Sequence, residues 1–200
     1  MTTMTYSDAL LQAAKDGDAQ AQLNLGMCYD MGEGVTQDIT EAVKWYRLAA
    51  EQGDAEAQHN LGVCYETGEG VTQDIKEAVK WYRLAAEQGD VDAQLNLGMS
   101  YDRGEGVEQD HQEAVKWFLL AAEQGDPEAQ YVLGLCYEVG DGVLEDNKES
   151  YFWYFISALN GYEEAREDLD MLAEDLSAPE REQIEVRAQK WMEEHNQEIE

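Results

Sequence analysis

Histidine, cysteine, serine and paired carboxylates are the side chains in this sequence that could carry chemistry. The three histidines, His59, His111 and His195, lie far apart along the chain, and no histidine or cysteine stands at metal-ligand spacing from another on one helix face. No Ser-x-x-Lys motif surrounds any serine, so a serine acyl-transfer site lacks its nucleophile and base. Carboxylate pairs occur throughout so acidic a chain and single out no acid/base site. The sequence therefore predicts a protein that is not an enzyme and has no catalytic residue, no bound metal and no cofactor.

The cysteines occupy one position of a repeated segment. Cys28, Cys64 and Cys136 are equivalent, and Ser100 stands in the remaining copy. Helices that stack in successive repeats lie roughly 8–10 Å apart, farther than the Cα separation of about 7 Å that a disulfide can bridge. We therefore expect free, buried thiols.

The charge of the chain limits its partners. The sequence has 44 acidic and 13 basic residues and a formal net charge of −31. Its long-range field repels nucleic acid and anionic membranes and favours a partner with basic residues. An alternative is that the charge only keeps an elongated surface soluble.

Neither a membrane span nor a signal peptide is predicted. No segment approaches the roughly eighteen apolar residues that cross a membrane, and the first six residues lack the charged and apolar pattern of a signal peptide. We expect a cytoplasmic protein that binds no membrane.

The elements that position these side chains are repeats of 36 residues. Residues 21–56 and 57–92 differ at only seven positions. A period in this range is typical of a solenoid, in which each repeat buries its apolar surface by stacking on its neighbours. The predicted organisation is one continuous solenoid domain with an N-terminal partial repeat that provides a capping helix (1–20), four repeats (21–56, 57–92, 93–128 and 129–164), and a C-terminal partial repeat with a capping helix (165–200).

Each repeat is predicted to contain a first helix, A, and a second helix, B. Helix A of the second repeat is predicted over about residues 55–67, after a turn in which Gly53 ends the preceding helix and Asp54 caps the next. Gly26, in the first helix A, is small enough to let helix B approach closely. The core stripe of this helix A is predicted to be Ala21, Leu25, Cys28 and Tyr29.

A Gly-x-Gly-Val turn follows helix A, and helix B then begins at a capping box such as Asp38 to Glu41. Its apolar arc in the first repeat is predicted to comprise Ala42, Trp45, Tyr46, Leu48, Ala49 and Ala50.

The ends of the chain are predicted to form partial repeats. Residues 5–16 are predicted to form a lone helix B and residues 163–175 a last helix A. A second box, Ser177 to Glu180, starts a final helix. Ile184, Ala188 and Trp191 form its apolar side, and the total is eleven helices and no strands.

A three-part motif recurs in the repeats: Ala-x-Ala-Gln-x-Asn-Leu-Gly-x-x-Tyr, then Gly-x-Gly-Val-x-x-Asp, then Glu-Ala-x-Lys-Trp-Tyr-x-x-Ala-Ala-Glu-Gln-Gly. Over about residues 5–175 it resembles the Sel-one-like repeat family, a group of tetratricopeptide-repeat-like α/α solenoids. The resemblance implies an all-α, right-handed superhelix whose A helices line a concave surface, and a role as an adaptor in protein complexes. Some relatives have two cysteines per repeat and were described as penicillin-binding or weak β-lactamase proteins, whereas this chain has one cysteine per repeat.

The candidate partner-binding residues are those of helix A that lie off the core stripe, in rows that stacking brings together. A groove mixing apolar and acidic side chains suits a peptide with hydrophobic anchors and lysine or arginine. The predicted contact residues are Leu23, Asn24, Met27, Asp30, His59, Asn60, Val63, Glu66, Leu95, Asn96, Met99, Asp102, Tyr131, Leu135 and Glu138.

The asparagine row has two interpretations. By resemblance, Asn24, Asn60 and Asn96 correspond to the groove amides that tetratricopeptide domains use on peptide backbone, where an amide both donates and accepts. Alternatively, these amides form hydrogen bonds with neighbouring loops or with backbone between repeats. The apolar residues of the contact set, such as Leu23 and Met27, would then pack between adjacent helices.

Together these features predict a monomeric, cytoplasmic scaffold that holds a partner protein or an extended peptide with basic residues in the concave groove. A second hypothesis is an acidic decoy or immunity-type inhibitor, which would cover a basic site with the glutamate-rich face of its B helices. A third is a weak β-lactamase-like hydrolase.

Overall fold

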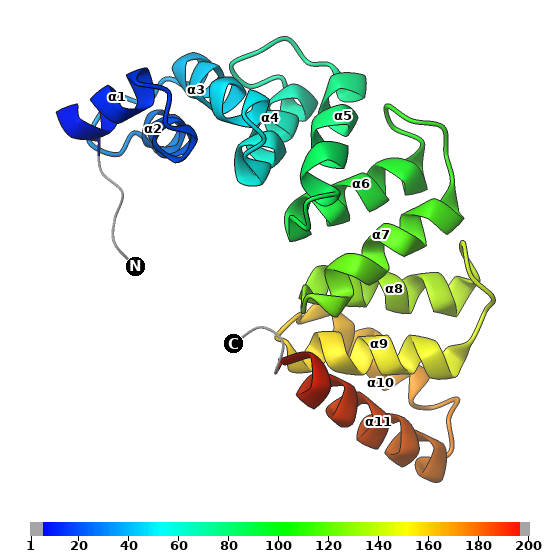
Figure 1. The fold of residues 1–200 in the computed structure, drawn as a ribbon. Coiled ribbons are helices and arrows are strands. Elements are labelled where there is room, and N and C mark those ends of the chain that lie inside the picture. The colour runs from blue at the N-terminus through cyan, green and yellow to red at the C-terminus, as the bar shows by residue number, and fades with distance from the viewer. Residues whose placement is uncertain (1–5, 197–200) are drawn as a thin grey trace. The chain divides into compact units, whose positions relative to one another are not determined.

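The helices repeat as the sequence predicts. A computed structural model describes residues 6–196, which form eleven helices and no strand (Figure 1). The fold is an all-α solenoid of tandem helix-turn-helix repeats. The helices are α1 (Asp8–Lys15), α2 (Ala19–Met31), α3 (Ile39–Glu51), α4 (Ala55–Thr67), α5 (Ile75–Ala86), α6 (Val91–Arg103), α7 (His111–Glu123), α8 (Pro127–Val139), α9 (Asn147–Leu159), α10 (Glu164–Leu172) and α11 (Ala178–Asn196). No helix within the described residues is long and apolar enough to cross a membrane.

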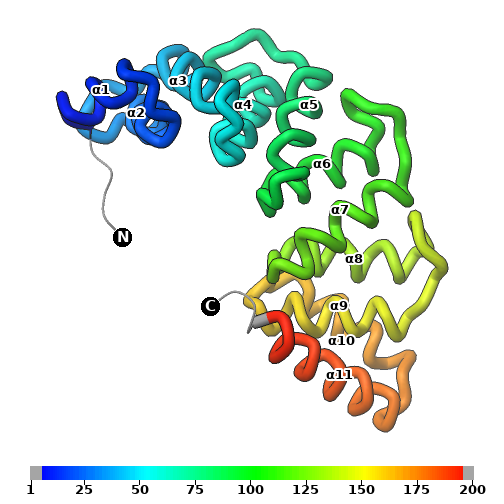
Figure 2. Tube along the Cα trace, viewed as in Figure 1, coloured from blue at the N-terminus to red at the C-terminus, as the bar shows by residue number. Residues whose placement is uncertain are grey.

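The chain divides into two compact units. Unit 1 comprises Met1–Ala93 and Glu105–Val107, and unit 2 comprises Gln94–Gly104 and Glu108–Glu200. In unit 1, α2 packs against α1 and α3, and α4 packs against α3 and α5. In unit 2, α8 packs against α7 and α9, and α9 also packs against α10 and α11; Figure 2 follows the same trace. The single continuous domain stays a prediction.

Aspartate caps begin the helices. Asp54 Oδ1 accepts a hydrogen bond from the Ala57 N–H (2.9 Å), and α4 begins and ends where predicted. Asp38 caps α3 in the same way through the Glu41 N–H (3.1 Å). The second half of the predicted capping box is wrong here, because the Asp38 N–H donates to the Tyr29 carbonyl instead (2.9 Å). The cap residue is thereby bonded to the preceding helix A.

The terminal helices are shorter than predicted. Helix α1 begins at Asp8 because the Ser7 hydroxyl caps it through the Leu10 N–H (3.1 Å), and the predicted first residue, 5, lies outside the described residues. Helix α10 starts after Glu163, which makes no side-chain capping bond. Helix α10 also ends at Leu172, three residues before the predicted end at 175, so no single helix end differs by more than one turn.

The apolar stripe of helix A is buried. In α2, Ala21, Leu25 and Cys28 are buried and Tyr29 is half-buried. Leu48 of helix B departs from the prediction, because it is 42% exposed. It lies at the edge of the apolar arc, so the buried face of α3 is narrower than its sequence indicates.

The cysteines are free, buried thiols, as predicted. Burial raises the pKa of Cys64 to about 11 and that of Cys136 to about 12. A thiol that stays protonated is a poor nucleophile, so these side chains act as small core residues.

Glycine in the middle of helix A lets an aromatic ring of helix B lie against its backbone. A Cβ added to Gly62 would stand 2.6 Å from Tyr82 Cε1 and 2.7 Å from its Cδ1. The Tyr82 ring is fully buried. The same contact joins Gly26 to Tyr46, as the prediction of a close approach at Gly26 requires.

Within each unit, a buried glutamine joins a repeat to the one before it. Gln58 Nε2 donates to the Ala50 carbonyl at the end of the preceding helix B (3.1 Å). Gln58 Oε1 accepts a hydrogen bond from Gln88 Nε2 in its own repeat (2.7 Å). The equivalent bonds link Gln22 to Ala14 and Gln52, and Gln130 to Ala122 and Asn160. The glutamine of the recurring motif therefore has a structural role.

The predicted C-terminal capping helix docks on α9. Ile184 and Ala188 are buried, and the Trp191 ring meets Trp153 edge-on at 5.4 Å. Arg187 lies over the Phe152 ring, with its guanidinium carbon 4.0 Å from the centroid. Helix α11 thus covers the apolar face that the last full repeat would otherwise expose.

Glu180 makes the docking of α11 dependent on pH. Its carboxylate accepts hydrogen bonds from the Ser177 hydroxyl (2.6 Å) and N–H (3.0 Å) and pairs with Lys148 (2.9 Å). The bonds from Ser177, followed by that from Lys148, lower the pKa of Glu180 to about 2. Because this pKa lies below the ordinary value of 4.5, the ionised carboxylate stabilises the fold above about pH 4.5. The contribution is lost as pH falls toward 2.

The loss of stability in Glu180→Gln, measured by urea unfolding, should accordingly be larger at pH 7 than at about pH 2.5. Glu182→Gln is the control, because Glu182 is an exposed glutamate of the same helix. An equal loss for Glu180→Gln at the two pH values would contradict the assignment.

Candidate partner-binding surface

The predicted contact residues of unit 1 lie on α2 and α4. All but one are half-buried: Asn24, Met27, Asp30, His59, Asn60, Val63 and Glu66. Leu23 is only 1% exposed and belongs to the core cluster around Tyr46 and Leu61. Met27 packs against the same cluster with part of its surface exposed. Leu23 is therefore a core residue and is left out of the surface considered below.

The predicted contact residues of unit 2 lie on α6 and α8. Asn96, Met99, Asp102, Tyr131 and Leu135 are half-buried, and Glu138 is exposed. Leu95 is buried, at 8% exposed, and is also left out. The burial of Leu23 and Leu95 favours the alternative interpretation at these two positions.

Three acids of the predicted contact set, one from each of three A helices, accept hydrogen bonds from tyrosines of the B helices. The Tyr46 hydroxyl donates to Asp30 (3.0 Å), Tyr82 to Glu66 (2.8 Å) and Tyr154 to Glu138 (2.6 Å). Burial, together with the neighbouring carboxylate, raises the pKa of each of these tyrosines well above its usual range. The hydroxyl therefore stays protonated and holds the acid in place, while the carboxylate keeps acceptor capacity for a further donor.

The third repeat lacks this bond. Phe118 replaces the tyrosine, and the acid of this repeat, Asp102, lies 2.9 Å from His111 Nδ1 instead. Asp141 approaches the same nitrogen to 3.1 Å. The hydrogen bond with Asp102, and then the charges of Asp141 and Asp102, raise the pKa of His111. Sequence spacing could not indicate this group, because its members come from α6, the start of α7 and the turn after α8.

The amide row is partly engaged within its own helix. Asn24 Oδ1 accepts a hydrogen bond from Gln20 Nε2, one turn earlier in α2 (3.2 Å). Asn24, Asn60 and Asn96 are all half-buried, so their side chains are accessible to a ligand. Neither interpretation of the row is excluded by these positions.

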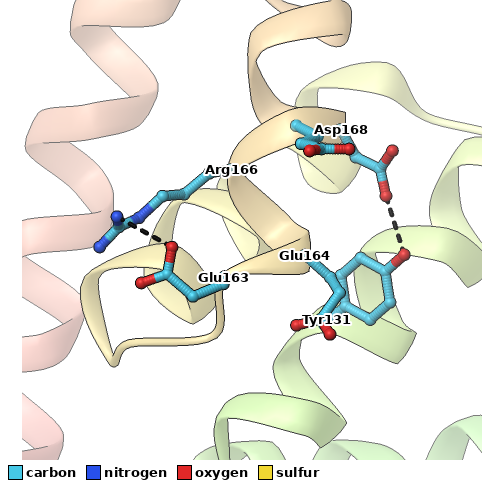
Figure 3. A pocket seen from close by; sticks show the side chains of 6 residues that line it. Tyr131, Glu163, Glu164, Arg166 and Asp168 are labelled. Atoms are coloured by element: carbon cyan, nitrogen blue, oxygen red, sulfur yellow. Dashed lines mark hydrogen bonds and ion pairs between the residues drawn. The ribbon is translucent and has the colours of Figure 1, made fainter.

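An acidic pocket lies between α8 and α10 in unit 2 (Figure 3). The cavity is about 500 Å³ and is lined by Tyr131, Glu163, Glu164, Arg166, Glu167 and Asp168. The Tyr131 hydroxyl points at Asp168 and donates to it (2.8 Å), and Arg166 pairs with Glu163 (3.1 Å). Four carboxylates against one guanidinium, itself paired, give the pocket a negative potential that attracts a cation.

Tyr131 is held at the wall of this pocket by aromatic neighbours. Its ring centroid lies 5.0 Å from that of Tyr162 and 5.6 Å from that of Tyr154. Burial and the hydrogen bond to Asp168 raise the pKa of Tyr131 to about 12, so the hydroxyl is a donor at neutral pH. Tyr131 is thus a predicted contact residue that the structure places in an open pocket together with acids.

The acids of α10 were missing from the prediction, although the repeat contains a signal for them. Adding the period of 36 residues to Tyr131 gives Glu167, and adding it to Val132, in the asparagine row, gives Asp168. The rows of candidate contacts therefore continue one helix further than the last full repeat.

Comparisons with known proteins support the repeat assignment. The Sel1 repeat family model matches residues 19–54, 55–90, 91–126 and 127–162. A solved structure of a protective antigen from uropathogenic Escherichia coli strains, which displays an SLR fold, is 41% identical with a TM-score of 0.83. The match covers 96% of this chain but 40% of the antigen, so the chain spans about two fifths of the antigen's length.

Two further structures are similar. A Sel1 repeat protein from Oxalobacter formigenes is 38% identical with a TM-score of 0.76, over 93% of this chain and 74% of that protein. The immunity protein Pa5087 from Pseudomonas aeruginosa is 21% identical with a TM-score of 0.53, over 93% of this chain and 72% of that protein, and shows a likeness of fold alone. A search of curated proteins finds no match.

Proposed function

Because this chain belongs to the Sel1 repeat family, we propose that it is a non-catalytic scaffold that binds a partner protein or extended peptide carrying lysine or arginine residues. Sel1 repeat proteins generally mediate interactions between proteins. What we propose for this chain in particular is that the partner is basic and that it binds to the A helices.

The acidic pocket beside Tyr131 carries the proposal. Its carboxylates are accessible, since Glu163, Glu164 and Glu167 are exposed. A lysine or arginine side chain entering the pocket would meet several carboxylates and could lay its aliphatic stem along the Tyr131 ring. The net charge of −31 adds long-range attraction that speeds the encounter with a basic partner.

The other acids of the A helices support the same chemistry. Asp30 and Glu66 in unit 1, and Glu138 in unit 2, are each oriented by a buried tyrosine hydroxyl. Half-buried apolar neighbours such as Met27 and Val63 offer contacts to hydrophobic side chains of a peptide. A ligand with alternating basic and apolar residues therefore fits these surfaces best.

A binding experiment tests this proposal. Short peptides selected from a randomised display library against the chain should be enriched in lysine and arginine, and their affinity, measured by fluorescence anisotropy, should fall between 0.05 and 0.5 M NaCl. At the higher concentration the Debye length is only about 4 Å, which screens the acidic surface. Replacing Glu163, Glu164 and Glu167 by glutamine should weaken binding at least about fivefold, because each exposed pair contributes a few tenths of a kcal/mol or more.

The matched control removes three charges from the B helices. Glu51→Gln, Glu87→Gln and Glu123→Gln together change the net charge equally at exposed, equivalent positions of α3, α7 and the end of α5. These substitutions should leave affinity nearly unchanged. The reverse result, with binding lost only in the B-helix variant, would support the acidic-decoy hypothesis and contradict the scaffold surface.

The groove amides are tested with the same peptides. Changing Asn24, Asn60 and Asn96 together to alanine should impair binding while the melting curve is preserved, because the side chains are half-buried and outside the core. If affinity is unchanged, the amides serve only their own helices and the resemblance to tetratricopeptide grooves is misleading at this row.

A further inference from the structure

Where the third repeat adjoins the turn of the fourth, the sequence departs from its sister copies in three ways. His111 replaces the isoleucine found at Ile39 and Ile75. Phe118 replaces a tyrosine, and Asp141 stands where the preceding three Gly-x-Gly turns have glutamate. The other copies therefore serve as internal comparisons for what these changes do.

Two of the changes, His111 and Asp141, meet with Asp102 around one imidazole nitrogen. His111 Nδ1 lies 2.9 Å from Asp102 Oδ1 and 3.1 Å from Asp141 Oδ1, and the ligand atoms all lie within 4.8 Å of one another. The side chains are 35–40% exposed, so an ion can reach them from solvent. Where the same position is Ile39 or Ile75, no ligand atom is available.

The backbone brings Asp141 to this point. The turn that contains it ends in Gly142, whose Cα lies against the His111 carbonyl so closely that a Cβ would collide with it. Asp102 belongs to the last turn of α6, and His111 is the first residue of α7. The group is thus fixed by two helix ends and a tight turn.

A neutral imidazole satisfies this arrangement poorly. Its Nδ1–H carries one proton, but two carboxylates face it, and like charges held this close repel each other. In the other repeats the acid accepts a tyrosine hydroxyl, which Phe118 cannot supply. Asp102 and Asp141 also line a cavity of about 130 Å³ with Phe118, where water molecules can complete a coordination shell.

We propose that Asp102, His111 and Asp141 bind a divalent transition-metal ion of the zinc class. In a tetrahedral site with bonds of about 2.0–2.1 Å, ligand atoms stand roughly 3.3 Å apart, close to the two separations from His111 Nδ1, 2.9 and 3.1 Å. One imidazole and two carboxylates suit Zn²⁺ or Co²⁺, whereas Ca²⁺ and Mg²⁺ take oxygen ligands in larger number. The three protein ligands leave a fourth position for water.

This inference is independent of the proposed function, because the ion is bound without a partner. Asp102 also belongs to the predicted contact set, and a bound ion would neutralise it. The peptide experiments above are therefore carried out with a chelator present, and the metal experiments without peptide.

The test uses untagged, chelator-treated protein at neutral pH. Excess Mg²⁺ is present to occupy carboxylates elsewhere on the surface that bind divalent ions weakly. Zn²⁺ titrated against a chromophoric chelator should bind as one ion per chain, and Co²⁺ should give visible d–d absorption. His111→Ile, which installs the residue of two sister repeats, should weaken Zn²⁺ binding at least about 100-fold. This expected loss lies at or above the upper end of the 10- to 100-fold range typical of outer-shell substitutions, because a direct ligand is removed.

Two further variants sharpen the result. Phe118→Tyr should also weaken binding, because a hydroxyl restored at this position would donate to Asp102 as Tyr82 does to Glu66. His195→Gln, at the far end of α11, should leave affinity unchanged. Zn²⁺ should raise the melting temperature of the native chain and not that of His111→Ile. No stoichiometric binding, or equal affinity in the native chain and His111→Ile, would overturn the proposal.

Discussion

Replacing Leu25 with alanine is expected to lower the free energy of unfolding by about 2–5 kcal/mol. Leu25 is fully buried and packs in unit 1 with Ala14 and Ala21, beside the half-buried Tyr29. Removing its side chain loses the free energy of burying the deleted methyl groups and leaves a cavity that the surrounding structure closes only in part. Urea unfolding followed by far-ultraviolet circular dichroism gives the difference.

The control for this experiment is Leu48→Ala. It deletes the same atoms from a leucine that is 42% exposed, so the loss should be well below that of Leu25→Ala. Because each repeat is stabilised by its neighbours, the damage from Leu25→Ala should spread to α1 and α3 and be visible as faster amide exchange there. Equal costs for the two substitutions would show that α2 does not bury its stripe as described.

Gly62→Ala should destabilise the fold by about 1–3 kcal/mol, although the same change in the middle of an ordinary helix is favourable. Alanine has the better helix propensity by about 0.5–1 kcal/mol. Its Cβ would, however, stand 2.6 Å from the buried ring of Tyr82, which cannot move without disturbing α5. The sign of the change, read from thermal or urea unfolding, therefore reports whether the helices touch here.

A double-mutant cycle separates crowding from other effects. In a Tyr82→Ala background the ring is gone, and Gly62→Ala should become neutral or stabilising. The energies should be strongly non-additive. A stabilising Gly62→Ala in the native background would contradict the close contact between α4 and α5.

The helices could be predicted from the sequence because their signals are local. Asp54 caps α4 and the Gly-x-Gly turn ends it, so its bounds needed no knowledge of the neighbours. The burial of Cys28 follows likewise from its place on a helical stripe. The four copies of the pattern also make the prediction of the helix bounds more secure, since the same capping and turn residues recur at equivalent positions in each copy.

The contacts between helices were harder to predict. The Asp38 N–H donates to the Tyr29 carbonyl of the preceding helix and not to the Glu41 carboxylate, and no local rule anticipates a tertiary acceptor. Asp102, His111 and Asp141 meet only because repeats stack, and spacing rules for metal ligands apply to one helix or loop at a time. Comparing equivalent positions between copies, rather than neighbours along the chain, would have drawn attention to His111.

The glutamine bonds have a consequence for how such a chain changes length. Gln58 takes one partner from the copy behind it, Ala50, and one from its own copy, Gln88. A duplicated stretch of 36 residues would bring the equivalent of Gln88 with it, find the equivalent of the Ala50 carbonyl in the copy before it, and present the same carbonyl to whatever follows. A gene of this kind can therefore gain or lose whole modules by recombination between near-identical segments without opening its interior, whereas an insertion of another size between a glutamine and its partner would disturb that one pair.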